Sequence, residues 1–252
     1  MKKFKIPDAN VMDIGANIGL YSLLAAKMNR SVIAVEPLHE NLNRFHKAAQ
    51  LENVQSRIIA LVNAVSNTRE EVKISILDNN VGGSYVVRPE LVEKNKRFNP
   101  VSSSVIVNSI LMDDLIDIYY EKMRSKVISS KGNQTLSRKF IMKLDIEGHE
   151  PFIFENSNKF FKTFQIVAIF MEFGKIVEKL DKLDLDKNPA YLIKVKNMLR
   201  MFQDLVYEPY EVNGFNKLEF KDWREWPWDI YFRKCDLVHC TSHEYKAQAV
   251  VV

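Results

Sequence analysis

The sequence has little of what would set it apart from ordinary globular proteins. Among 252 residues there are only 8 glycines and 2 cysteines. So few glycines exclude a collagen-like or glycine-rich linker chain. Two cysteines cannot form the disulfide framework that holds small secreted folds together. The 36 basic residues exceed the 32 acidic residues only slightly, so the net charge does not demand a nucleic acid or an acidic membrane as partner.

Long apolar segments are also missing. The longest clean one, residues 166–171, is far shorter than the roughly 20 residues that a membrane-spanning helix needs. Residues 1–10 begin with basic side chains but have no apolar core behind them, so they do not predict a secretory signal. We therefore expect no membrane span and a cytoplasmic protein. A hydrophobic fraction of 46% is typical of a soluble chain that buries a full core.

Short apolar strands alternate with segments of helical spacing along the chain. The predicted strands cover residues 10–14, 31–35, 57–65, 72–77, 104–110, 140–144, 166–171, a segment near 210, and 228–232. The predicted helices cover residues 20–29, 40–51, 112–120, about 151–161, and 188–205. This alternation predicts an α/β fold, a mostly parallel sheet with helices on both faces. Residues 122–139 carry six basic residues and no acidic one, which we interpret as an exposed loop.

The first strand ends in a loop with a leading acid and two glycines, Asp13, Gly15, Asn17 and Gly19. It is not the dinucleotide fingerprint G-x-G-x-x-G, because Asn17 and Leu20 stand where that motif needs glycine. Ligands of parallel sheets bind beyond the carboxyl ends of the strands. A loop of this kind suits a ligand that lacks a diphosphate but carries an amino group, such as S-adenosylmethionine. A tight turn without a ligand is the alternative.

The next two strands also end in polar residues. Glu36 lies 21 residues after Gly15, the spacing at which an acid accepts hydrogen bonds from ribose hydroxyls. Asn63 and Ala64 follow at the third strand, where an amide side chain can bind an adenine edge. A turn asparagine is the simpler interpretation of Asn63 taken alone.

The fourth strand ends in the densest group of charges, Lys143, Asp145, Glu147, His149 and Glu150. Such residues are costly beside a buried strand unless they pair with one another or take part in function. An ion-paired helix cap is the alternative. At the end of the fifth strand, Glu172 adds another acid to the same edge of the sheet.

Taken together, the segments DIGANIGLYS, AVEP, NAVS and MKLDIEGHE resemble the FkbM-type methyltransferases over about residues 10–235. The resemblance implies a single Rossmann-like class I methyltransferase domain, with a seven-stranded sheet whose last strand is antiparallel. It implies S-adenosylmethionine as cofactor and O-methylation of a hydroxyl on a sugar or small natural-product-like acceptor. It assigns residues to the cofactor loop (Asp13, Gly15, Asn17, Gly19), the ribose (Glu36), the adenine (Asn63, Ala64) and the methyl-transfer site (Asp145, Glu147).

An alcohol that accepts a methyl group must lose its proton, and a positioned base assists that step. Our hypothesis is that Asp145 or Glu147 accepts this proton, directly or through His149, while Lys143 tunes their pKa values or binds the acceptor. A divalent ion held by Asp145, Glu147 and Glu172 is a second possibility, since hard cations prefer oxygen ligands. We favour a site without metal.

We divide the chain into a short extension (residues 1–9), the methyltransferase domain (10–235) and a frayed tail (236–252). Family members usually carry more chain before the first strand, so a non-catalytic interaction or cofactor-sensing protein stays open as the alternative. The expected partner is a small-molecule or glycan acceptor and not nucleic acid, and the sequence does not predict the oligomeric state. Three tryptophans, Trp223, Trp226 and Trp228, are interpreted as turn and core residues rather than as a platform for a sugar ring.

Overall fold

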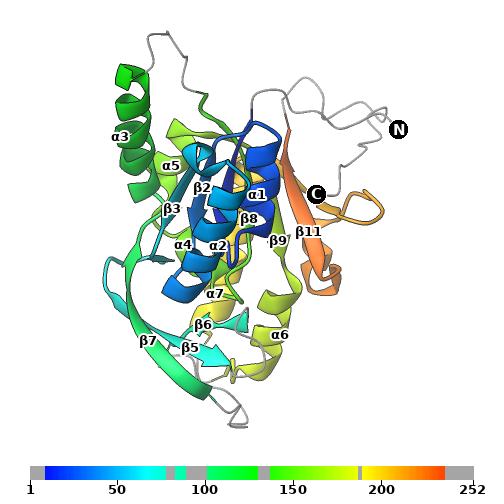
Figure 1. The fold of residues 1–252 in the computed structure, drawn as a ribbon. Coiled ribbons are helices and arrows are strands. Elements are labelled where there is room, and N and C mark those ends of the chain that lie inside the picture. The colour runs from blue at the N-terminus through cyan, green and yellow to red at the C-terminus, as the bar shows by residue number, and fades with distance from the viewer. Residues whose placement is uncertain (1–8, 78–82, 89–100, 130–136, 187–188, 236–252) are drawn as a thin grey trace.

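The computed structural model describes residues 9–77, 83–88, 101–129, 137–186 and 189–235, which form two sheets and the helices around them (Figure 1). The larger sheet has seven strands in the order β10-β11-β9-β8-β1-β2-β3. In that order the strands are Tyr207–Glu211, Asp229–Lys234, Gln165–Glu172, Lys139–Leu144, Asn10–Ile14, Val32–Val35 and Ile58–Leu61. In this sheet β11 runs opposite to the other six strands. The predicted α/β fold, with a mostly parallel seven-stranded sheet and an antiparallel last strand, is confirmed.

Seven α-helices are seen in the described residues. They are α1 (Leu20–Lys27), α2 (His39–Leu51), α3 (Asp114–Ser129), α4 (Glu150–Ile153), α5 (Asn158–Thr163), α6 (Gly174–Lys182) and α7 (Ala190–Asp204). The side chains of β2 point alternately into two hydrophobic cores. Val32 and Ala34 pack with α1 and α2, whereas Ile33 and Val35 face the larger core that includes residues of α3, α5, α6 and α7. Burial on both faces explains why β2 is continuously apolar.

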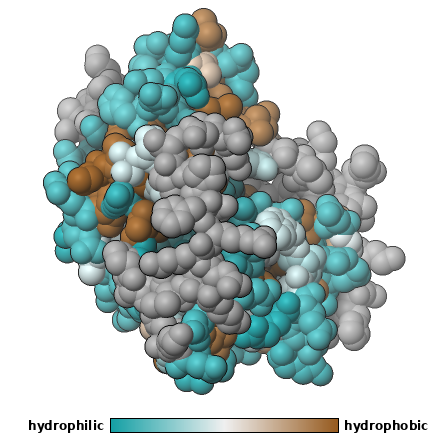
Figure 2. Space-filling view, turned by 90° about the horizontal axis from the view of Figure 1, so that it is seen from below, coloured by the Kyte–Doolittle hydropathy of each residue, from teal (hydrophilic) through white to brown (hydrophobic). Residues whose placement is uncertain are grey.

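The smaller sheet, in the order β4-β7-β5-β6, was not predicted as a separate unit. Its strands are Ala64–Val65, Val101–Ile110, Glu71–Leu77 and Tyr85–Val86. In Figure 1, β5 and β6 lie at the bottom of the molecule. Viewed from this end, the described surface is mostly hydrophilic, with hydrophobic residues gathered toward one side (Figure 2).

The single strand predicted over residues 57–65 was wrong. It divides after Leu61, because β3 pairs with β2 in the large sheet while β4 pairs with β7 in the small one. Apolar periodicity marks both pieces as buried strands, and it does not show that they join different sheets. The consequence is that Asn63 lies at the junction of the two sheets.

The basic segment 122–139 was also predicted wrongly as a loop. Helix α3 continues to Ser129 and β8 begins at Lys139, while residues 130–136 lie outside the described part. Lysine and arginine are good helix formers, so a run of positive charge does not end a helix. The helix predicted over residues 151–161 is two short helices, α4 and α5, and α6 was not predicted.

Within the described ranges, no helix is both long enough and apolar enough to cross a bilayer. The cytoplasmic location and the boundaries of the three predicted segments stay predictions.

Candidate functional site

A cleft lies where β1, β2 and β8 end and the small sheet begins. Its enclosed volume of about 60 Å³ is less than the few hundred Å³ that are usual for a small-ligand pocket, so most of the cleft is open to solvent. Eight of the predicted site residues line the cleft: Gly15, Asn17, Glu36, Asn63, Ala64, Asp145, Glu147 and His149. The other three, Asp13, Gly19 and Lys143, do not line it.

The loop after β1 turns through three residues with positive φ, Gly15 (83°), Asn17 (51°) and Gly19 (84°). A Cβ atom on Gly15 would lie 1.8 Å from the carbonyl oxygen of Asp145, so this glycine lets the β1 and β8 loops touch. At Gly19, a Cβ atom would lie 2.1 Å from the ring of Phe45. Gly15 therefore shapes the cleft, and Gly19 permits α2 to pack against the loop.

Glu36 is buried at the end of β2 and its carboxylate is held by three donors. The Asn17 amide donates to Oε2 at 2.8 Å, while Oε1 accepts from the Leu38 amide and from Asn41 Nδ2, each at 3.1 Å. A carboxylate offers about four acceptor positions. Roughly one position, on Oε2, is therefore left for a ligand, rather than the two that a pair of ribose hydroxyls would use. Burial raises the pKa of Glu36, against the lowering effect of these hydrogen bonds.

Asp13 and Lys143 form a buried link beneath the β1 loop. Asp13 is fully buried, and it accepts a hydrogen bond from Ser22 Oγ at 2.7 Å. Lys143 Nζ lies 3.7 Å from Asp13 and 3.1 Å from Asp145, and it donates to the carbonyl oxygen of Gly15 at 2.9 Å. Burial alone would lower the pKa of Lys143, but the two carboxylates outweigh it and raise the pKa. The charged side chain of Lys143 therefore links the loops after β1 and β8.

Side chains of α4 and α7 hold the loop after β8 in place. Glu147 (φ 57°) and Gly148 (φ 81°) are consecutive residues with left-handed backbone, which turns the chain sharply. The fully buried Glu150 accepts the Ile146 amide at 3.0 Å, and Tyr191 donates its hydroxyl to the Gly148 carbonyl at 2.6 Å. Burial raises the pKa of Glu150 to about 7. These contacts fix the backbone that carries Asp145 and Glu147.

Three half-buried carboxylates gather at this edge, those of Asp145, Glu147 and Glu172. One oxygen atom from each lies within 4.8 Å of the others, and Lys175 Nζ lies 3.0 Å from Glu147 Oε2. Burial raises the pKa of Glu147, and the charges of Asp145 and Glu172 add to that effect, while Lys175 opposes it. A cluster of this composition suits either a proton acceptor or a hard cation. Both possibilities stay open.

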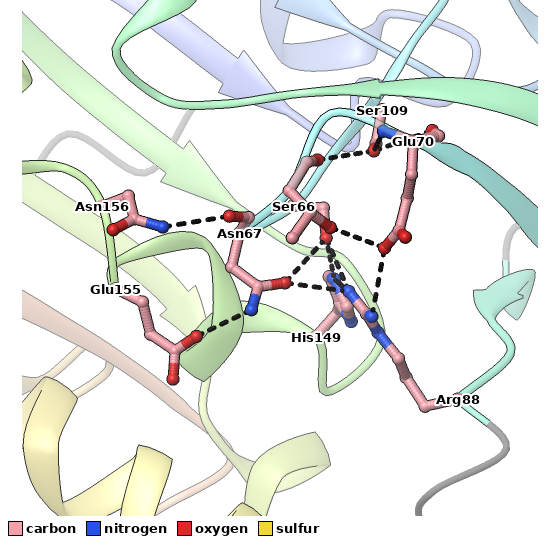
Figure 3. A network of polar contacts seen from close by, with 9 residues as sticks. Ser66, Asn67, Glu70, Arg88, Ser109, His149, Glu155 and Asn156 are labelled. Carbon is pink, nitrogen blue, oxygen red and sulfur yellow. Dashed lines mark hydrogen bonds and ion pairs between the residues drawn. The ribbon is translucent and has the colours of Figure 1, made fainter.

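His149 belongs to a network that joins the two sheets (Figure 3). Its ring stacks on Phe152 at 4.6 Å, and Nε2 lies 3.3 Å from Ser66 Oγ and 3.4 Å from Arg88 Nη2. Burial, and then the charges of Arg88, Lys179 and Lys194, lower the pKa of His149 well below its usual value, so the ring is neutral. In the described part of the chain no hydrogen bond connects it to Asp145 or Glu147. A proton relay through His149 therefore has no contact to support it.

Sequence reasoning did not identify three residues that complete the site, Asn41, Arg88 and Lys175. Asn41 follows Glu36 within the first turn and a half of the next helix, a place where a polar side chain reaches back to the strand end. The sequence therefore contained a signal for Asn41. Arg88 and Lys175 stand in no recognisable motif, and only long-range contacts bring them beside His149 and Glu147, which line the cleft.

Comparisons with known proteins give a family model and several solved structures that this chain resembles. A family model described as Methyltransferase FkbM domain matches residues 13–209. No curated protein matches the chain. A solved FkbM methyltransferase from Methylobacillus flagellatus KT is 15% identical, with a TM-score of 0.47, and the match covers 91% of this chain but only 44% of that one.

Two further solved structures are also similar. An rRNA methylase from Streptococcus thermophilus has 10% identity and a TM-score of 0.40, covering 91% of this chain and 89% of that one. The fibrillarin/Nop5p complex has 11% identity and a TM-score of 0.35, covering 89% and 71%.

Proposed function

Because this chain belongs to the FkbM methyltransferase family, we propose that it is an S-adenosylmethionine-dependent O-methyltransferase. The proposed acceptor is a hydroxyl group of a sugar or small natural-product-like molecule. The observation that carries the proposal is Glu36, a buried carboxylate at the end of β2 that lines the cleft beside the Gly15–Asn17 turn. A carboxylate kept in this position is suited to a ribose hydroxyl.

The described residues fit the cofactor in two further respects. Asn63 uses its amide nitrogen to bind the Asn108 carbonyl at 3.1 Å, so its amide oxygen is the group that would accept from an adenine amino group. The carboxylates of Asp145 and Glu147 line the same cleft and would attract a positively charged ligand. Bound S-adenosylmethionine would supply an electrophilic methyl group on a positively charged sulfur atom.

For the chemical step, the protein has to hold the acceptor oxygen in line with the methyl group and take up the proton of the hydroxyl. Positioning accounts for much of the acceleration in such displacements. Glu147 and Asp145 are the proposed proton acceptors. Glu147 has the raised pKa that favours a base. Both carboxylates are paired with a lysine, Asp145 with Lys143 at 3.1 Å and Glu147 with Lys175 at 3.0 Å. Lys143 and Glu150 hold the loop and do not take up the proton in this proposal.

The test begins with calorimetric titration of the full chain with S-adenosylmethionine, followed by a methyl-release assay over panels of sugars and small natural products. We expect saturable binding and turnover on at least one hydroxylated acceptor. Failure to bind the cofactor would end the proposal. Binding without turnover on any acceptor would favour the non-catalytic cofactor-sensing alternative. Running the assay with and without a chelator decides whether a divalent ion at Asp145, Glu147 and Glu172 is needed.

A further inference from the structure

The three tryptophans near the last strand differ in exposure. Trp226 is buried in the large core, and Trp223 is partly buried against Phe173. Trp228, in contrast, is 46% exposed. It is therefore not a core residue, and an exposed indole in a fixed position needs another explanation.

Trp228 is held in place by the backbone of Gly174. A Cβ atom on Gly174 would lie 2.3 Å from the indole, so the ring packs directly against a bare glycine. The Gly174 amide also donates to the Trp228 carbonyl at 2.9 Å. An aromatic ring that is already fixed loses little conformational freedom when a ligand stacks on it.

This indole lies next to the carboxylates of the proposed reaction site. Asp229, the neighbour of Trp228, pairs with Glu172 in the register of β11 and β9. Lys175 Nζ lies 5.7 Å from the centre of the Trp228 ring and 3.0 Å from Glu147. Burial, and then the charge of Asp145, raise the pKa of Asp229.

We define the acidic arc as the four carboxylates at this edge: Asp145, Glu147, Glu172 and Asp229. We propose that Trp228 is the stacking surface of the acceptor subsite and takes the C–H face of a sugar ring, whose hydroxyl groups donate to the acidic arc. This inference rests on the proposed function, because it names the substrate class of the same site.

The chemistry of the arc separates this ligand from others. Carboxylates accept hydrogen bonds, so they suit a ligand with many hydroxyl donors and one apolar face. A phosphate backbone would meet like charges, which disfavours nucleic acid. A flat aromatic acceptor would stack on the indole but would leave most of the carboxylates without a hydroxyl partner.

The experiment uses the full chain with methyl α-glucopyranoside, methyl α-mannopyranoside and methyl α-galactopyranoside as probes, and with catechol and uridine monophosphate for comparison. Saturation-transfer NMR measures their affinity with and without S-adenosylhomocysteine, whose own binding is measured by calorimetry. We expect at least one glycoside to bind, and to bind more tightly than catechol or the nucleotide. Trp228→Ala should weaken that binding about tenfold, whereas Trp228→Phe should retain most of it.

Two further variants complete the design. Gly174→Ala should weaken glycoside binding as well, because the new methyl group displaces the indole, while Trp223→Phe should bind as the wild type does. Circular dichroism and thermal unfolding verify that each variant folds. No glycoside binding, stronger binding of catechol or nucleotide, or equal binding by wild type and Trp228→Ala would overturn the subsite. S-adenosylhomocysteine binding is scored separately, so its loss would count against the proposed function instead.

Discussion

The two sides of the cleft stabilise their carboxylates in different ways. On the β2 side, Glu36 is held by backbone amides and one asparagine, all of which are fixed dipoles. On the β8 side, Asp145 and Glu147 are paired with the ammonium groups of Lys143 and Lys175. Fixed dipoles preserve one geometry, which suits binding. A paired ammonium charge sets how readily its carboxylate takes up a proton, which bears on chemistry.

The strongest test of this difference is to neutralise the β8 side alone. Asp145→Asn and Glu147→Gln keep the shape of each side chain but remove its basicity. If either residue is the base, its variant should lose about 10²- to 10⁴-fold in turnover, while S-adenosylhomocysteine affinity stays nearly unchanged. Steady-state methyl release and calorimetry measure the two quantities. Glu52→Gln, at the exposed pair with Lys27, is the matched control. Wild-type turnover in both variants would remove the proton-acceptor assignment.

A second prediction concerns the point where the two sides touch. Gly15→Ala places a methyl group 1.8 Å from the Asp145 carbonyl at a residue with φ of 83°. Such strain and overpacking should lower the free energy of unfolding by about 3 kcal/mol. Urea denaturation measures the change. Gly214→Ala is the control, since the nearest atom there is the movable end of the Glu211 side chain. Equal stability of the two variants would show that the loops do not meet at Gly15.

A third prediction uses the buried carboxyl beneath the β8 loop. The pKa of Glu150 is raised from 4.5 to about 7, so the folded protein binds more protons than the unfolded chain between these values. Its contribution to stability is therefore greatest below pH 4.5 and falls as pH rises toward 7. The loss amounts to about 3 kcal/mol. Glu150→Gln should remove this part of the pH dependence, and the exposed Glu71→Gln should not. Urea denaturation at pH 5 and 7.5 compares the slopes, and identical slopes in wild type and Glu150→Gln would contradict the prediction.

A smaller effect is expected on the β2 side. Glu36→Gln retains a hydrogen-bond acceptor but loses its charge, so S-adenosylmethionine should bind about tenfold more weakly. Calorimetry measures the affinity, and the exposed neighbour Glu40→Gln is the control. Because one fixed carboxylate is proposed to bind the ribose, turnover at saturating cofactor should change much less than affinity. A variant with full affinity would argue against the ribose contact.

The smallest effect is expected at His149, which contacts Arg88 at the small sheet. Arg88→Met removes one of the charges that lower the pKa of His149. That pKa should rise but stay below its usual value, because burial is the larger cause and is unchanged. NMR titration of the His149 ring measures the shift. An unchanged pKa would mean that Arg88 does not reach the ring in solution.

Much of the fold follows from local pattern. Strands such as β2 and β8 are continuously or alternately apolar, and polar residues stand directly after them. Because the carboxyl ends of parallel strands meet at one edge, Glu36 and Asp145 were predicted to face the same cleft, and both line it. The division of residues 57–65 between two sheets was missed because apolar periodicity is the same in either sheet.

By itself, the sequence determined which carboxylates stand at the strand ends, since that depends only on short-range order along the chain. Only the tertiary structure decided which groups stabilise each of these carboxylates. Lys143 reaches the Gly15 carbonyl across 128 residues of sequence, and Arg88 reaches His149 across 61. The exposure of Trp228 was decided in the same way, by a glycine 54 positions earlier that leaves room for its ring. Charge pairing and packing depend on distances in space, which chain order does not specify.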